Sequence, residues 1–167
     1  MPSDSDDADD EYGYAKASVE DVSTVPNPTR VKKELDEALG VSEFGLNYYE
    51  ADPGEDVPWG YHRHPEHEEV FLVLDGELTV ETADGDYVVG TGEAFFVPAD
   101  APNKATVTGD VPARFVAVGA PKESDWAVIS EECPNCGEET DRESEVDGDE
   151  YVLYCAECGA EVDRLLR

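Results

Sequence analysis

The feature that most restricts the possible folds is a series of short apolar runs between residues 44 and 130, separated by turns. The runs are FGLNYYEA, GYHRH, EVFLVLDG, ELTVET, DYVV, AFFVP, KATVTG, ARFVAVG and WAVIS, and the turn sequence ADGD follows ELTVET. Short strand-like runs with a turn about every 8–12 residues are typical of a β-sandwich or barrel. The segment therefore predicts an all-β domain.

The run EVFLVL at 69–74 is apolar on both faces that a strand presents. Because side chains alternate along a strand, one face carries Glu69, Phe71 and Val73, and the other carries Val70, Leu72 and Leu74. A strand with two apolar faces must be covered on both sides. We expect the first face to line a cavity and the second to lie against another sheet or a second subunit, which favours a homodimer.

Three side chains that commonly bind metal ions lie at or just before this run. His62 and His64 are two residues apart, so both point to one face of an extended strand, and Glu69 begins EVFLVL. Two imidazoles and a carboxylate suit Mn, Fe, Ni or Zn, and they leave coordination positions open for water or a substrate. We therefore predict a barrel metal site at His62, His64 and Glu69.

The spacing HxHx(4)Ex(6)G, which ends at Gly76, resembles the first motif of the cupin superfamily. The resemblance implies a double-stranded β-helix, the jelly-roll cupin barrel, and a homodimer, the usual cupin assembly. The family's leading glycine is displaced, because Gly54 lies further ahead of His62 than the motif requires. This change alters a loop length and leaves the ligands in place.

The second cupin motif, Gx(5)PxGx(2)Hx(3)N, is matched only in part by GEAFFVPADAPNK, which begins at Gly92. Pro98 is in place, but Asp100 replaces a glycine and Asn103 stands where the fourth ligand, a histidine, belongs. Since a neutral amide oxygen binds transition metals weakly, we expect reduced affinity. Asn103 or His67 could complete the site; alternatively, Asn103 caps a turn and His67 is a solvated residue of the PEHE turn.

All four cysteines lie near the C-terminus, in CPNCG at 133–137 and CAECG at 155–159. Two CxxC pairs at this separation are typical of a structural zinc site, in which tetrahedral thiolates hold the ion and the following glycines permit tight knuckles. The arrangement resembles a zinc ribbon. A thioredoxin-like redox site would need a βαβ context that is missing here, and disulfides are disfavoured in a reducing cytosol. We therefore predict zinc at Cys133, Cys136, Cys155 and Cys158.

The order of these features predicts three regions. Residues 1–20 are acidic with few apolar anchors, which predicts a disordered tail. Residues 29–129 would form the barrel with a short N-terminal helix in RVKKELDEALG, capped by Thr29 and stopped by Gly40. Residues 130–167 would form the zinc ribbon.

The chain has 42 acidic and 11 basic residues, for a net charge of -31. Such a charge repels nucleic acid, and its even spread resembles the acidic proteins of halophilic archaea, whose self-repulsion is screened at molar salt. The N-terminus lacks the basic and apolar segments of a signal peptide, and no apolar run is long enough to span a membrane. We expect a soluble, cytoplasmic protein that binds neither nucleic acid nor membrane.

Three functions remain open at this point. The first is a barrel that binds a metal and/or a small molecule, for which a regulatory role is open, with the ribbon as a rigid appendage. The second is a metal-dependent enzyme, an isomerase or oxygenase, that uses His62, His64 and Glu69. The third is a non-catalytic dimeric scaffold. Because no nucleophile–base pair or cofactor fingerprint is present, the sequence leaves open whether the protein is an enzyme.

Overall fold

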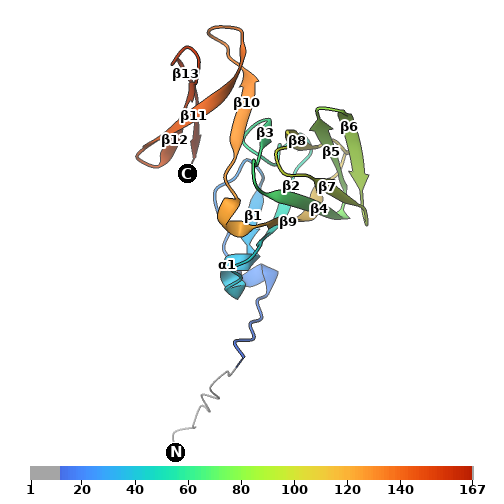
Figure 1. Cartoon of the computed structure of the whole chain (residues 1–167). Helices are drawn as coiled ribbons and strands as arrows, with labels where there is room; N and C mark the ends of the chain where they lie inside the picture. Colours follow the sequence, from blue (N-terminus) through green and yellow to red (C-terminus); the bar gives the residue numbers. More distant parts are fainter. Residues whose placement is uncertain (1–11, 167) are drawn as a thin grey trace, which may run out of the picture.

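A computed structural model describes residues 12–166 of the chain and contains two antiparallel β-sheets (Figure 1). The first sheet has the strand order β1 (Val31–Glu34), β2 (Gly45–Ala51), β9 (Ala113–Ala120), β4 (Glu68–Asp75) and β7 (Ala94–Val97). The second has the order β13 (Glu161–Leu166), β12 (Glu150–Cys155), β11 (Glu139–Asp147), β10 (Val128–Glu132), β3 (His62–Arg63), β8 (Asn103–Val107), β5 (Glu77–Thr82) and β6 (Gly85–Gly90). The all-β prediction is confirmed.

The core lies between the first sheet and strands β3, β5, β6 and β8 of the second, which together form the barrel. Phe115 of β9 is fully buried, stacks on Tyr49 at a ring distance of 4.8 Å and meets Phe71 edge-on at 6.3 Å. Leu78 and Val80 of β5 are likewise fully buried and belong to the same apolar cluster. Side chains from both sheets therefore fill one interior.

The alternation predicted for EVFLVL is confirmed. Phe71 and Val73 are buried in the barrel, whereas Leu72 and Leu74 on the opposite face are 40% and 45% exposed. This alternation follows from the period of two along a strand. It leaves an apolar outer face on the first sheet.

The predicted N-terminal helix is wrong over its first half. Helix α1 spans only Leu35–Leu39, whereas residues 31–34 form β1, which pairs with β2. The residue at the helix N-cap position is Glu34 rather than Thr29, whose hydroxyl instead bonds with Asn27. Pairing with an existing strand supplies long-range backbone hydrogen bonds, which override the local helical spacing. Gly40 does end the helix, with a φ of 71°.

Strands β10–β13, here called the C-terminal module, extend from the barrel as an arm (Figure 1). Strand β10 belongs to both parts, because Val128 and Ile129 pair with β3 whereas residues 130–132 pair with β11. The Glu131 carboxylate also accepts a hydrogen bond from the Tyr61 amide at 2.9 Å. The boundary predicted between residues 129 and 130 therefore falls inside a shared strand.

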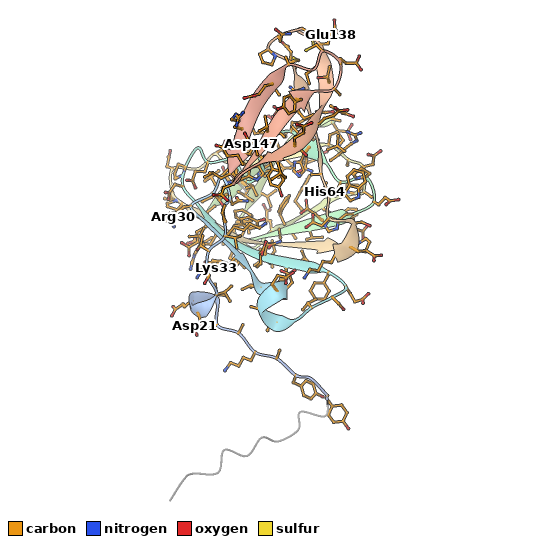
Figure 2. The ribbon with its side chains drawn as sticks, turned by 90° about the vertical axis from the view of Figure 1, so that its left-hand side faces the viewer. Asp21, Arg30, Lys33, His64, Glu138 and Asp147 are labelled. Atoms are coloured by element: carbon orange, nitrogen blue, oxygen red, sulfur yellow. The ribbon has the colours of Figure 1, made fainter. Side chains whose placement is uncertain are left out.

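Part of the predicted acidic tail lies outside the described residues, since the structure describes the chain from residue 12. Within the rest of that tail, Val19–Asp21 form a 3-10 turn, and Lys33 Nζ donates to the Val19 carbonyl at 2.7 Å. Figure 2 shows Asp21 and Lys33 on the side of the molecule away from Glu138, which lies at the tip of the C-terminal module. No helix of the described residues is long and apolar enough to cross a membrane.

Candidate metal centres

The structure brings the three predicted barrel ligands together. His62 lies on β3, His64 follows that strand, and Glu69 lies on β4 in the opposite sheet. One possible ligand atom from each residue lies within 4.8 Å of the others, and His64 Nε2 is 3.7 Å from a Glu69 carboxylate oxygen. These residues could therefore hold one metal ion between the two sheets.

Backbone carbonyls orient both imidazoles toward this shared position. His62 Nδ1 lies 3.2 Å from the Gly60 carbonyl oxygen, and His64 Nδ1 lies 3.1 Å from that of Trp126. Because a carbonyl only accepts, each Nδ1 must carry the hydrogen, which leaves the Nε2 lone pair free. Histidine ligands in metal sites are usually held in this way by a second hydrogen bond.

Burial sets the protonation of the three groups. Desolvation lowers the pKa of His62 to about 4 and also lowers the pKa of His64, so both imidazoles are neutral near pH 7. Desolvation raises the pKa of Glu69 to about 7. Neutral imidazoles are the metal-binding form, and a metal ion would displace the proton from Glu69 on binding.

Asn103 lies beside this group with an unsatisfied side chain. It is the first residue of β8, is paired in register with His62, and is 1% exposed. Neither the oxygen nor the nitrogen of its amide has a hydrogen-bond partner among the described residues. A buried amide without partners costs free energy, and Asn103 lines the cavity next to His62 and His64. Its side chain therefore presents one acceptor and one donor group to whatever occupies that cavity.

His67 is neither a solvated residue of the PEHE turn nor a member of the group of metal ligands. Its side chain is buried, so the interpretation as a solvated loop residue is wrong. Nδ1 donates to the Pro121 carbonyl at 2.8 Å, and a Cβ at Gly119 would collide with Nε2. The ring is therefore packed into the wall formed by residues 119–121. It lies outside the group of three ligands that could share an ion.

A cavity of about 180 Å³ opens beside the ligand group. Its walls include the amide side chains of Asn27 and Asn47, the rings of Tyr49 and Trp59, and the cation Lys32. Sequence reasoning did not find Asn27, Asn47 or Lys32, because they come from β2 and from residues before it and carry no local motif. The cavity combines apolar surface with polar groups, which is the usual character of a small-molecule site.

The four cysteines also converge, as predicted. Their sulfur atoms all lie within 4.8 Å of one another, with Sγ–Sγ distances of 3.8 Å between Cys133 and Cys158 and 3.9 Å between Cys136 and Cys155. Four sulfurs placed tetrahedrally at about 2.3 Å from zinc would be about 3.8 Å apart. The cluster therefore fits a small zinc site.

The two CxxC segments share one backbone pattern. Cys133 N donates to the Glu138 carbonyl and Gly137 N to the Cys133 carbonyl, and the same two bonds join Cys155 with Ala160 and Gly159 with Cys155. Gly137 and Gly159 have φ angles of 74° and 69°, which side chains disfavour. The Thr140 hydroxyl, 3.1 Å from Cys155 Sγ, lowers the pKa of that thiol to about 6. These features match a pair of metal-binding knuckles.

Comparison with known proteins identifies the barrel. The profile of the family described as "Cupin domain" matches residues 47–119, which contain β3 to β8 and most of β2 and β9. The double-stranded β-helix predicted from the first motif is thereby confirmed. No curated protein matches the chain.

Solved structures with the same fold include two proteins described as sugar phosphate isomerases. The one from Silicibacter pomeroyi is 22% identical, with a TM-score of 0.57, and the match covers 92% of this chain and 93% of that one. The one from Acidithiobacillus ferrooxidans is 23% identical, with a TM-score of 0.57, and the match covers 82% and 80%. The polyketide cyclase RemF from Streptomyces resistomycificus is 24% identical, with a TM-score of 0.55 and coverage of 65% and 80%. At these identities the likeness shows the fold alone.

Proposed function

We propose that the cupin domain at residues 47–119 binds a divalent metal ion through His62, His64 and Glu69, and that a small molecule in the adjoining cavity coordinates this ion. Three ligands leave positions open on the metal, as in sites that bind substrate or water. Asn103 or a water molecule would take the fourth position. The C-terminal cysteines would hold a structural zinc ion.

One observation carries this proposal. Both imidazoles donate Nδ1–H to backbone carbonyls, and their ligand atoms converge with Glu69 within 4.8 Å at the wall of a cavity. A group with only a structural role would be expected to satisfy its polar atoms internally. Two imidazoles and one carboxylate match the ligand preferences of Mn, Fe, Ni and Zn.

A titration with Mn²⁺, followed by electron paramagnetic resonance, tests the barrel site selectively. Manganese prefers oxygen and nitrogen ligands, whereas four thiolates select softer ions. We expect one bound Mn²⁺ per chain in the native protein and none in His62→Ala. Tyr87→Ala, which removes an exposed ring of β6, is the control and should retain the ion. Equal binding in the native protein and His62→Ala would refute the site.

A metal-dependent isomerase is the second candidate function. The two structures described as sugar phosphate isomerases match 92% and 82% of this chain. Lys32 could meet an anionic group, and the amides of Asn27, Asn47 and Asn103 could meet hydroxyl groups. Incubation of the metal-loaded protein with aldose and ketose phosphates in D₂O tests this function. Deuterium at the carbon next to the carbonyl would support isomerase activity. Unlabelled sugars would contradict it, and metal and small-molecule binding would then be the function that stands. An oxygenase would instead consume O₂, and a scaffold would bind neither metal nor sugar.

We further infer that a second copy of the chain covers the outer face of the first sheet. The strand registers place Val70, Leu72, Val116, Val118 and Phe96 on that face, and Leu72 and Phe96 are 40% and 52% exposed. An apolar face of this kind is usually buried in an interface. Light scattering should give a dimer for the native protein and a monomer for Leu72→Glu. Val88→Glu, on the second sheet, should remain dimeric.

A further inference from the structure

A second cavity, a groove of about 260 Å³, lies beside the barrel cavity, between the barrel and the C-terminal module. The two cavities share three lining residues, Trp59, Ala127 and Ile129. Ile129 is the register partner of His62, so the shared wall is one strand, or about 4.8 Å, from a predicted metal ligand. The groove therefore continues the barrel cavity away from the metal ligands.

The C-terminal module forms the far wall of this groove. The strand registers place Ser144 opposite Leu153 and Tyr151 opposite Leu165, so side chains from β11, β12 and β13 meet there. Tyr151 and Trp59 are each 37% exposed. Two accessible aromatic rings and three leucine or isoleucine residues thus line the groove and are available to an apolar ligand group.

The groove also differs from the chain as a whole in charge. The protein has a net charge of -31, yet among residues 12–166 no carboxylate lines the groove and Arg142 is the one charged lining residue. The Arg142 guanidinium donates to the carbonyls of Glu131, Glu132 and Thr140, so its hydrogen bonds hold the module together. A partly aromatic surface without a described carboxylate, in so acidic a chain, suits an apolar group.

We propose that the groove binds an aromatic arm of the small molecule whose polar head coordinates the barrel metal. This inference rests on the proposed metal-binding function and adds the class of ligand, a chelating head joined by a short linker to an aromatic ring. Small-molecule sites usually have volumes of about 300–1,000 Å³. The barrel cavity alone is smaller than this range, and the cavity and groove together fall within it. The C-terminal module is then part of the binding site.

Two hydroxamates with the same chelating head test the proposal. Acetohydroxamate carries only a methyl group, whereas 4-phenylbutyrohydroxamate adds a phenyl ring on a short linker. Calorimetric titration of the Ni²⁺-loaded full chain should give at least about tenfold tighter binding for the phenyl compound, since burying a ring is strongly favourable.

Variants in the groove locate the source of that gain. In Tyr151→Ala the ratio of the two affinities should fall below about threefold, because a groove wall is lost. Ser144→Trp, which fills the groove from an exposed position without emptying a core, should lower the ratio in the same way. Tyr87→Ala is the matched control, since this ring is similarly exposed and lies on β6, and it should retain the full ratio.

The outcomes separate the two proposals. If acetohydroxamate binds to the metal-loaded protein but the phenyl group adds nothing, the groove assignment is wrong and the metal site stands. The same conclusion follows if the gain survives in both groove variants. If neither compound binds, the barrel metal site fails, and the groove assignment fails with it.

Discussion

The two candidate metal centres of this chain have opposite designs. The cysteine cluster takes four identical ligands from two short knuckles, and each knuckle closes with its own backbone hydrogen bonds. The barrel group takes two imidazoles and a carboxylate from opposing sheets, and it opens onto a cavity. Four thiolates leave no free position on zinc, whereas three ligands leave at least one. The first design stabilises a small module, and the second leaves room for chemistry or ligand binding.

The largest expected effect is loss of the cysteine site. Cys133 is fully buried and follows directly from β10, so Cys133→Ser should remove one zinc per chain and unfold β11–β13. Structural zinc contributes about 10–16 kcal/mol to the folding of zinc-finger peptides. Hydrogen exchange should show lost protection in the C-terminal module.

The comparison predicts that the two metal sites are independent, so that loss of one leaves the other unchanged. His62→Ala should leave zinc content and protection of the module unchanged. If Cys133→Ser keeps its zinc, or if the module stays protected without zinc, the closed site is not what holds the module together.

Glu69 provides a pH test of the barrel group in protein stripped of metal. Burial raises its pKa to about 7 from the ordinary value of 4.5, so the folded state prefers the protonated form. The resulting contribution to stability is complete below pH 4.5 and is lost as the pH rises through about 7. Glu69→Gln does not titrate and should be more stable than the native protein by about 3 kcal/mol at pH 8.

Urea unfolding at pH 4 and pH 8 measures this difference. The exposed neighbour Glu68 serves as the control, because Glu68→Gln should show no comparable gain at pH 8. Equal stability of Glu69→Gln and the native protein at pH 8 would show that Glu69 ionises without cost.

A substitution at Asn103 tests whether the barrel group lacks a fourth metal ligand. Asn103→His would place an imidazole next to His62 and should tighten binding of Zn²⁺ or Ni²⁺ by about tenfold or more, since imidazole is a better ligand than an amide. Asn47→His, elsewhere on the cavity wall, should change the affinity little. Competition against a metal indicator measures both. If the two variants are equal, Asn103 does not face the metal.

Added salt should have the smallest of these effects, a rise in the thermal stability of the whole chain. Repulsion among the carboxylates is poorly screened in dilute buffer, and the Debye length falls from about 10 Å at 0.1 M salt to about 3 Å at 1 M. The melting temperature should therefore rise by several degrees between 0.1 M and 2 M KCl. A flat or falling midpoint would contradict this reading of the net charge of -31.

Features encoded by local spacing were predicted well. The period of two placed Phe71 and Leu72 on opposite faces of β4, and the structure confirms it. The spacing of His62, His64 and Glu69 predicted their convergence, because side chains two residues apart in an extended segment point to the same face. Each CxxC segment holds its two cysteines in one tight turn, so the paired segments predicted the cysteine cluster.

Features that depend on distant segments were not predicted. The pairing of β1 with β2 converted the start of an expected helix into a strand. His67 is buried because Pro121, 54 residues later, accepts its hydrogen bond, and the carbonyl that orients His64 comes from Trp126, 62 residues away. Backbone carbonyls carry no sequence signal, so neither contact could be found by motif or composition.

Metal content per chain tests the central claim most directly. Protein purified with added Mn²⁺ or Ni²⁺ should contain two metal ions per chain, and mild chelation should leave one, a zinc ion with an all-sulfur shell at about 2.3 Å by X-ray absorption. His62→Ala should contain only that zinc before chelation. A native protein that never exceeds one ion per chain, with His62→Ala identical to it, would contradict the account.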